Sequence, residues 1–223
     1  MDLIESALSE GRRTLSEYES KLVLSYYEIP VVQELLAVSE SELESAINAL
    51  GFPLAIKACA PNITHKTDLN LLKLNLQTKQ EALDAFRFMT VELAKLGGGA
   101  VLVQKMARGQ RELMVGMTRD PQFGPCVMFG LGGIFAEALE DVSFRVAPLE
   151  NKDALEMMNE IRARKLLGAF RGMPPVDTER LSGILVNLGR LGMENDRVQE
   201  VDINPLIIDE GSPVAVDALI ALN

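Results

Sequence analysis

The 223-residue sequence contains a single histidine, His65, in the polar stretch that follows an apolar segment ending at Cys59. One histidine cannot form a multi-histidine metal site. A neutral imidazole is nucleophilic near pH 7, so His65 can carry a phosphoryl group or act as a general base. It can equally be an exposed side chain without a role, and the neighbouring residues must distinguish these interpretations.

Lys57 lies in the apolar run Leu54–Cys59, which predicts a short buried strand. An unpaired ammonium among apolar neighbours is unfavourable, so Lys57 requires an anionic partner or a route to water. Two interpretations remain open. Lys57 is a fixed cation for a phosphate, or it faces solvent from an edge strand.

The C-terminal segment predicts a β-hairpin that collects oxygen donors. If residues 209–212 form the turn and Ile208 pairs with Pro213, Asn204 lies directly opposite Asp217. Opposed residues have Cβ atoms about 4.5–5.5 Å apart, and Asp202, two positions before Asn204, points to the same side. A site with so few protein oxygens suits Mg²⁺ better than zinc. The alternative is a solvated acidic strand face.

Three further positions are weaker candidates. Gly130–Gly133 follows an apolar strand and could place backbone N–H groups against a phosphate, although such a loop is more often a plain turn. Gln104 and Glu112 lie at the ends of apolar strands, where polar side chains are usually just exposed.

Helices and strands alternate along the chain. Capping-box patterns at Ser16 and Ser39 begin two helices, and Gly51 ends the second. Further helical patterns cover 79–96, 153–167 and 178–191, and strand patterns cover 31–38, 54–59, 72–76, 101–104, 111–117, 125–129, 200–208 and 213–220. The sequence therefore predicts an α+β protein of two lobes that meet at a cleft.

The glycines at 97–99 suggest the main boundary. We expect an N-terminal helical segment over 1–20 and a first lobe over 21–100 that carries Lys57 and His65. The second lobe, over 101–223, carries the C-terminal hairpin.

Composition narrows the class of protein. Thirty-two acidic and 22 basic residues give a net charge of −10, which argues against binding to nucleic acid or an anionic membrane. Cys59 and Cys126 have no CxxC spacing and are typical of a reducing compartment. The sequence shows neither a targeting signal nor a membrane-spanning stretch, so we expect a soluble cytoplasmic protein.

Five ordered segments resemble the ATP-grasp β subunit, or β domain, of NDP-forming acyl-CoA synthetases. This group, which includes ADP-forming acetate–CoA ligases, is related to the β subunit of succinyl-CoA synthetase. The resemblance extends from about Ser16 to Leu222 and is carried by residues 57–68, 120–133, 141–149, 171–175 and 201–206. It implies a two-lobed ATP-grasp fold that holds ATP or ADP and Mg²⁺ between antiparallel sheets.

The resemblance also implies roles for individual residues at the nucleotide. Lys57 would reach the phosphates, and Glu112 would lie by the ribose or phosphates. The remaining nucleotide contacts would be a hinge strand that reads adenine mainly through its backbone, and a glycine pair: Gln104, Lys105, Met106, Gly132 and Gly133. Asn204 and Asp217, with Asp202, match the positions that hold Mg²⁺.

His65 matches a histidine that receives phosphate from a phosphohistidine on a CoA-binding α subunit and passes it to ADP. Asp68, in the same motif, is the second catalytic residue implied. The net reaction would convert acyl-CoA, ADP and phosphate reversibly to acid, CoA and ATP. The chain would then require an α partner, in a heterotetramer.

One segment departs from the family pattern. Members usually follow His-Lys-Ser-Asp with a valine and two glycines, whereas Leu69, Asn70 and Leu71 stand here. Glycine permits φ > 0, which leucine resists. Two alternatives therefore stay open: a nucleotide-sensing module that has lost turnover, and a free-standing ATP-grasp ligase that activates a carboxylate.

Overall fold

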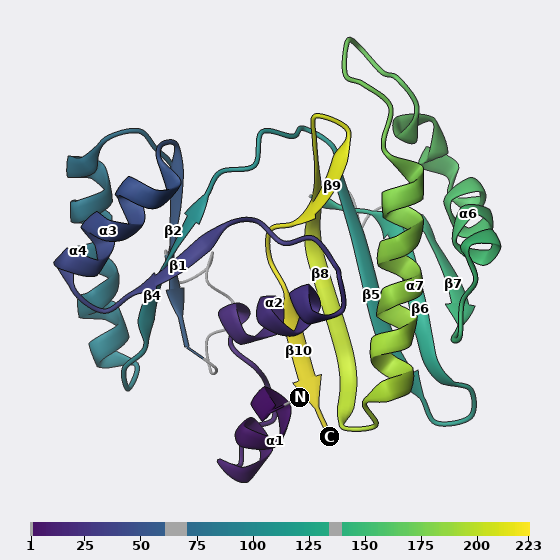
Figure 1. The fold of residues 1–223 in the computed structure, drawn as a ribbon, viewed down its shortest axis with the longest axis horizontal. Coiled ribbons are helices and arrows are strands. Elements are labelled where there is room, and N and C mark those ends of the chain that lie inside the picture. The colour runs from purple at the N-terminus through teal and green to yellow at the C-terminus, as the bar shows by residue number, and fades with distance from the viewer. Residues whose placement is uncertain (1, 61–70, 134–139) are drawn as a thin grey trace. The chain divides into compact units, whose positions relative to one another are not determined.

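The computed structural model describes residues 2–60, 71–133 and 140–223, which form two compact units (Figure 1). Unit 1 comprises Met1–Leu15, Glu19–Val31 and Ala107–Asn223, and unit 2 comprises Ser16–Tyr18 and Val32–Met106. These limits differ from the expected boundaries at 20 and 100. Strand β4 (Ala100–Lys105) pairs with strands of unit 2, while Ile4 and Ala7 of helix α1 (Asp2–Ser9) join the core of unit 1.

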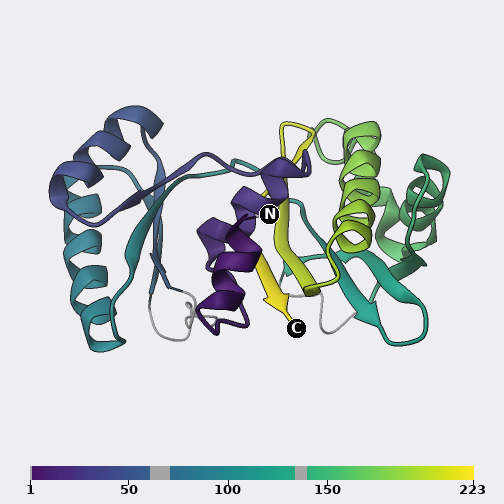
Figure 2. The ribbon, with the colours of Figure 1, turned by 60° about the horizontal axis from the view of Figure 1, so that its bottom comes forward.

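Unit 2 is a four-stranded antiparallel sheet in the order β1-β4-β2-β3. Its other strands are β1 (Glu34–Ala37), β2 (Leu54–Cys59) and β3 (Leu72–Leu76). Helices α3 (Glu40–Leu50) and α4 (Lys79–Lys95) lie on the same side of this sheet (Figure 2). Ile56 and Val103 from the sheet and Leu43 and Met89 from the helices form one apolar core.

Local signals determine where these helices begin and end. The Ser39 hydroxyl accepts a hydrogen bond from the Glu42 N–H, and Gly51, at φ 67°, donates its N–H to the Ile47 carbonyl. Helix α4 begins with a capping box between Thr78 and Glu81. The limits predicted for α3 from its caps are confirmed, because capping depends on neighbours within one turn.

Unit 1 is built on an antiparallel sheet in the order β10-β8-β5-β6-β7, with β9 paired to β8. The strands are β5 (Glu112–Asp120), β6 (Gly124–Leu131), β7 (Val142–Val146), β8 (Val198–Asp209), β9 (Ser212–Ala215) and β10 (Leu219–Leu222). Helix α7 (Thr178–Glu194) packs along β5 and β6, and α6 (Asn151–Glu160) covers β6 and β7. Helix α2 (Glu17–Tyr26) contributes Val23 and Leu24 to the same core. No helix among the described residues combines the length and apolarity needed to cross a bilayer.

The helix predicted over 153–167 is broken in two. Helix α6 ends at Glu160, Ile161 is extended with ψ 142°, and a 3₁₀ helix, η2, follows over Arg162–Leu167. The Asp141 carboxylate accepts hydrogen bonds from the N–H groups of Arg162 and Ala163, each at 2.7 Å. A distant side chain therefore starts the second helical segment, which no local pattern predicts.

A buried ion pair lies on the interior strand β2 of unit 2. Lys57 Nζ is 2.7 Å from Glu17 Oε1, and the two side chains are 3% and 1% exposed. The interpretation of Lys57 as a solvent-facing residue on an edge strand is wrong, because β2 lies between β4 and β3. Its anionic partner in this structure is Glu17.

Replacing Glu17 by Gln should destabilise the protein by about 3–5 kcal/mol, because the Lys57 ammonium stays buried without this carboxylate. The double variant Glu17→Gln, Lys57→Met should recover most of the loss, since the ammonium that lost its carboxylate is then also removed. Urea unfolding followed by circular dichroism measures both effects.

The matched control is the exposed pair formed by Arg87 and Glu40, with side chains 58% and 50% exposed. Glu40→Gln should change the unfolding free energy far less than Glu17→Gln, because water screens an exposed pair. Equal effects from the two substitutions would contradict a special role for the buried pair.

Candidate functional site

The two predicted catalytic residues, His65 and Asp68, lie outside the described residues. Leu71 is described, and it is 1% exposed in the core of unit 2. Its carbonyl accepts a hydrogen bond from the Ala58 N–H at 3.0 Å. The second position at which the family has glycine is therefore packed as a core residue.

The expected adenine-reading strand belongs to unit 2. Gln104 is buried on β4, in register with Glu34 of β1 and Ala55 of β2. The N–H of Lys105 donates to the Gln33 carbonyl at 2.9 Å, and that of Met106 donates to the Pro53 carbonyl at 3.1 Å. Both N–H groups are therefore satisfied within unit 2, and the reading of adenine through the backbone stays a prediction for the carbonyl groups.

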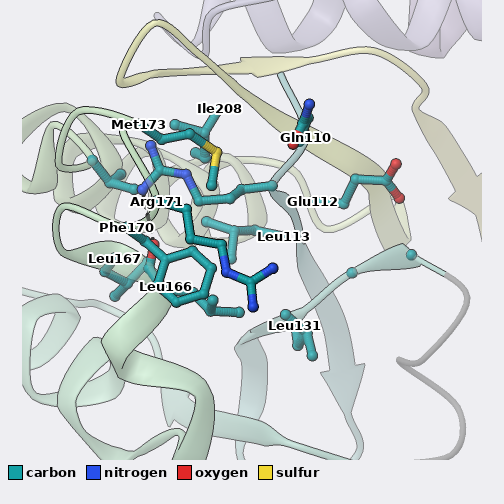
Figure 3. Close-up of a pocket in the computed structure, with 14 residues that line it drawn as sticks. Gln110, Glu112, Leu113, Leu131, Leu166, Leu167, Phe170, Arg171, Met173 and Ile208 are labelled. Atoms are coloured by element: carbon teal, nitrogen blue, oxygen red, sulfur yellow. Dashed lines mark hydrogen bonds between the residues drawn. The ribbon is translucent and has the colours of Figure 1, made fainter. Parts of the chain in front are cut away.

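Glu112, Gly132 and Gly133, three of the predicted nucleotide residues, line one cavity of about 520 Å³ in unit 1 (Figure 3). Leu113 and Leu131 form part of its wall on β5 and β6, and Leu166 and Phe170 come from the segment that follows α6. The cavity is large enough for a small molecule, since ligand sites typically measure about 300–1,000 Å³.

Close packing against the backbone of β5 requires glycine at 132, and the left-handed backbone favours glycine at 133. A Cβ atom on Gly132 would lie 2.6 Å from the Leu113 carbonyl oxygen, and one on Gly133, at φ +75°, would lie 2.7 Å from Glu112 Oε2. The Gly132 N–H donates to the Glu112 carbonyl at 2.9 Å. This N–H is therefore used inside the protein. The sequence analysis had considered it as a donor to a phosphate, and it does not have that role in this structure.

The register predicted for the C-terminal hairpin is confirmed around its turn. Ile208 pairs with Pro213 and Leu206 with Ala215. Glu210 and Gly211, at φ 49° and 93°, give the left-handed turn that a two-residue hairpin requires. Beyond an interruption, Asp202 pairs with Leu219 in the same register.

Asn204 and Asp217 share this register but are not a pair of the β-ladder, which corrects the expectation of a regular hairpin at this point. The ladder is interrupted at Pro205, because proline has no N–H to donate. The Pro205 carbonyl instead accepts a hydrogen bond from the Val216 N–H at 3.1 Å. This hydrogen bond joins the two strands at the interruption, because the proline carbonyl can still accept.

The carboxylates of this hairpin repel one another. The pKa of Asp202 is raised from its usual 3.8 to about 6, first by burial and then by the negative charges of Glu200 and Asp217. The described residues contain no group of three or more His, Cys, Asp or Glu side chains arranged to hold a metal ion. A cation here would rest on Asp202, Asp217 and the amide oxygen of Asn204.

The structure divides the predicted site residues between its two units. Unit 2 carries Lys57 and residues 104–106. Unit 1 carries the cavity lined by Glu112, Gly132 and Gly133, and it carries the C-terminal hairpin with Asp202 and Asp217, called the acidic hairpin below. Sequence reasoning missed Glu17, which neutralises Lys57 from 40 positions away. The sequence indicated only that a buried lysine needs an anionic partner. It did not indicate which acidic residue that partner is.

Comparison with known proteins identifies the family. The ATP-grasp domain family matches residues 6–222. The β subunit of ADP-forming acetate–CoA ligase I from Pyrococcus furiosus is 44% identical over 225 residues, which cover 99% of this chain and 97% of that protein.

Solved structures agree with this assignment. Dinucleotide-forming acetyl-coenzyme A synthetase 1 from Ca. Korarchaeum cryptofilum, in complex with coenzyme A, Ca-AMPCP and HgCl⁺, gives a TM-score of 0.93 at 43% identity, covering 100% of this chain and 99% of that chain. The same enzyme with coenzyme A and Mg-AMPPCP, its phosphohistidine segment pointing towards the nucleotide binding site, gives a TM-score of 0.88 at 42% identity and the same coverage. The chain therefore belongs to the ATP-grasp family, among the β subunits of ADP-forming acyl-CoA synthetases.

Proposed function

We propose that this chain is the nucleotide-binding β subunit of an ADP-forming acyl-CoA synthetase and that His65 carries phosphate between an α subunit and ADP. The observation that carries the proposal is the full-length match to the P. furiosus β subunit. His65 is the only histidine in the sequence, so a phosphohistidine on this chain can form only there.

The proposed reaction is acyl-CoA, ADP and phosphate giving acid, CoA and ATP. The His65 imidazole attacks the phosphorus of a phosphohistidine on the α subunit, and that histidine leaves. A β-phosphate oxygen of ADP then displaces His65 and forms ATP. A CoA-binding α subunit is required for the first transfer, and we propose that the two kinds of subunit assemble as a heterotetramer in the cytoplasm.

In phosphoryl transfer the protein mainly positions the reacting groups and neutralises the charge of the phosphates. Lys57 would supply a fixed positive charge for the phosphates, held by Glu17 at 2.7 Å. Gln104, Lys105 and Met106 would border the adenine. Glu112 would orient the ribose at the cavity that it lines with Gly132 and Gly133.

The donor set of the hairpin fits Mg²⁺. Two carboxylates and an amide are hard oxygen donors, and Mg²⁺ usually combines one or two carboxylates with water and phosphate oxygens. The repulsion that Asp202 experiences from Asp217 and Glu200 is the electrostatic condition that a bound cation would relieve. Bound there, Mg²⁺ would neutralise charge on the nucleotide phosphates.

A second candidate, a nucleotide-sensing module without turnover, is favoured by one observation. Leu71 stands where the family has a glycine, and it is buried in the core of unit 2. If phosphate transfer requires the segment before Leu71 to move, this anchor opposes the movement. The two candidates differ in whether His65 becomes phosphorylated.

His65→Ala should abolish ATP formation from acyl-CoA, ADP and phosphate when the chain is assembled with its α subunit. It should also remove acid-labile, base-stable phosphate from this chain. A coupled ATP assay and phosphohistidine analysis measure the two results.

Arg180→Gln, an exposed change on α7, is the control and should leave both readouts unchanged. Full ATP formation by His65→Ala would exclude the carrier role. Nucleotide binding without any phosphohistidine in the wild type would favour the sensing module.

Asp217→Asn should weaken binding of Mg·ADP at least about tenfold, because one charged oxygen is lost from the cation. Calorimetric titration of ADP with and without Mg²⁺ measures the effect. Binding in the absence of Mg²⁺ should change much less, and equal losses under both conditions would contradict a metal-ligand role.

Asp202 should make stability depend on pH. Its pKa is higher in the folded protein than in the unfolded chain, so the folded state binds more protons between about pH 4 and pH 6, and stability falls as the pH rises through that window. Without Mg²⁺, Asp202→Asn should therefore be more stable than the wild type above pH 6, by about 1–3 kcal/mol. Below pH 4 the difference should vanish, and urea unfolding across this range would detect it. A difference that persists unchanged at low pH would argue against the titration.

A further inference from the structure

The segment Phe170–Pro175 includes residues 171–175, one of the five segments that carry the family resemblance, but it has no role in the reaction proposed above. It forms a tight hairpin in which Phe170 and Met173 exchange backbone hydrogen bonds at 3.2 and 2.9 Å. Phe170, Arg171 and Met173 line the same cavity of about 520 Å³ as Leu113 and Leu131 (Figure 3). This hairpin is therefore one wall of a possible binding site.

Arg111 fixes the hairpin to the start of β5. Arg111 is 7% exposed, and its guanidinium donates to the carbonyls of Leu166, Gly168 and Pro174 at 2.9, 3.1 and 2.6 Å. Its Nε is buried and has no hydrogen-bond partner within the described part of the chain. A buried donor without an acceptor is unfavourable, so the wall of this cavity holds a cation with unused capacity to donate.

Arg171 presents a second cation at the cavity. It occupies the left-handed region at φ 46°, beside Gly172 at φ 82°, a conformation that is unfavourable for a residue with a side chain. Its guanidinium lies 5.3 Å from the centre of the Phe170 ring. Among the described residues no carboxylate forms an ion pair with it, although the protein carries a net charge of −10.

The rest of the lining is mainly apolar, from Leu113, Leu131, Leu166, Leu167, Phe170, Met173, Val176 and Ile208. Among the described residues that line the cavity, the one carboxylate is that of Glu112, which points away from Phe170 and Arg171 in Figure 3. Such a surface is poor for a highly charged polyphosphate. It suits a ligand with an apolar body and a single anionic head.

We propose that this cavity binds an organic anion with an apolar body and a carboxylate or phosphate monoester head. The Arg171 guanidinium pairs with the head, the Phe170 ring and the leucines cover the body, and Arg111 holds the wall in place. The head is bound at the Arg171 end of the cavity, away from the Glu112 carboxylate, and no α subunit is required.

The test uses the full chain with three aromatic probes of one size: phenylacetate, phenyl phosphate and the neutral phenylacetamide. Isothermal titration calorimetry should detect at least one of the two anions with a Kd on the order of 0.1–1 mM. The neutral amide should bind at least about tenfold more weakly, because it lacks the charge-assisted contact. Comparison of the two anions identifies the preferred head group.

Arg171→Gln should weaken binding of the anion at least about tenfold, and Arg171→Lys should restore part of the affinity, because it keeps the charge but not the planar fork. Arg180→Gln, a substitution of an exposed arginine that does not line the cavity, is the matched control and should bind as the wild type does. Saturating Mg·ADP should leave the affinity for the anion unchanged.

Three results would overturn the proposal: no binding of either anion, equal binding by the wild type and Arg171→Gln, or complete competition by Mg·ADP. The last result would assign the cavity to the nucleotide site. Loss of ATP formation in His65→Ala bears only on the phosphate relay, so the two proposals can fail separately.

Discussion

A buried ammonium on an interior strand must have an anion beside it, and unit 2 is built around this constraint. Lys57 lies on β2 between two neighbouring strands, and Glu17 meets it at 2.7 Å with almost no exposure of either side chain. Glu17 belongs to the short stretch 16–18 that is part of unit 2, while the sequence on both sides of it belongs to unit 1.

In unit 1, unlike the Lys57–Glu17 pair of unit 2, buried polar and charged groups are only partly compensated by their neighbours. Burial and two neighbouring carboxylates hold the pKa of Asp202 at about 6. Arg111 satisfies three carbonyls but leaves one donor unused. Incomplete compensation of this kind is costly in a folded protein and is tolerated where a ligand or ion completes it. The acidic hairpin and the arginine-lined cavity are therefore the two places in unit 1 where binding is most strongly indicated.

The family assignment supports nucleotide binding, but the local geometry does not support every predicted nucleotide contact. Gly132 is demanded by packing against the backbone of β5, and Gly133 is favoured by its left-handed φ of 75°. The backbone donors of Lys105 and Met106 are likewise occupied within unit 2. Residues that match a binding motif can thus be required by the fold itself, and a motif match alone does not separate the two causes.

The sequence by itself determined the features that depend on near neighbours. The capping residues Ser39 and Gly51 defined α3, and the turn at Glu210 and Gly211 set the hairpin register, because these interactions span only a few residues. The ordered motifs also determined the family, which the full-length match supports. Only the tertiary structure decided that Glu17 neutralises Lys57, that Asp141 starts η2, and that Arg111 holds the hairpin carrying Arg171. Those contacts join residues that are 40, 21 and 63 positions apart in the sequence, and no periodicity links such positions until the chain is folded.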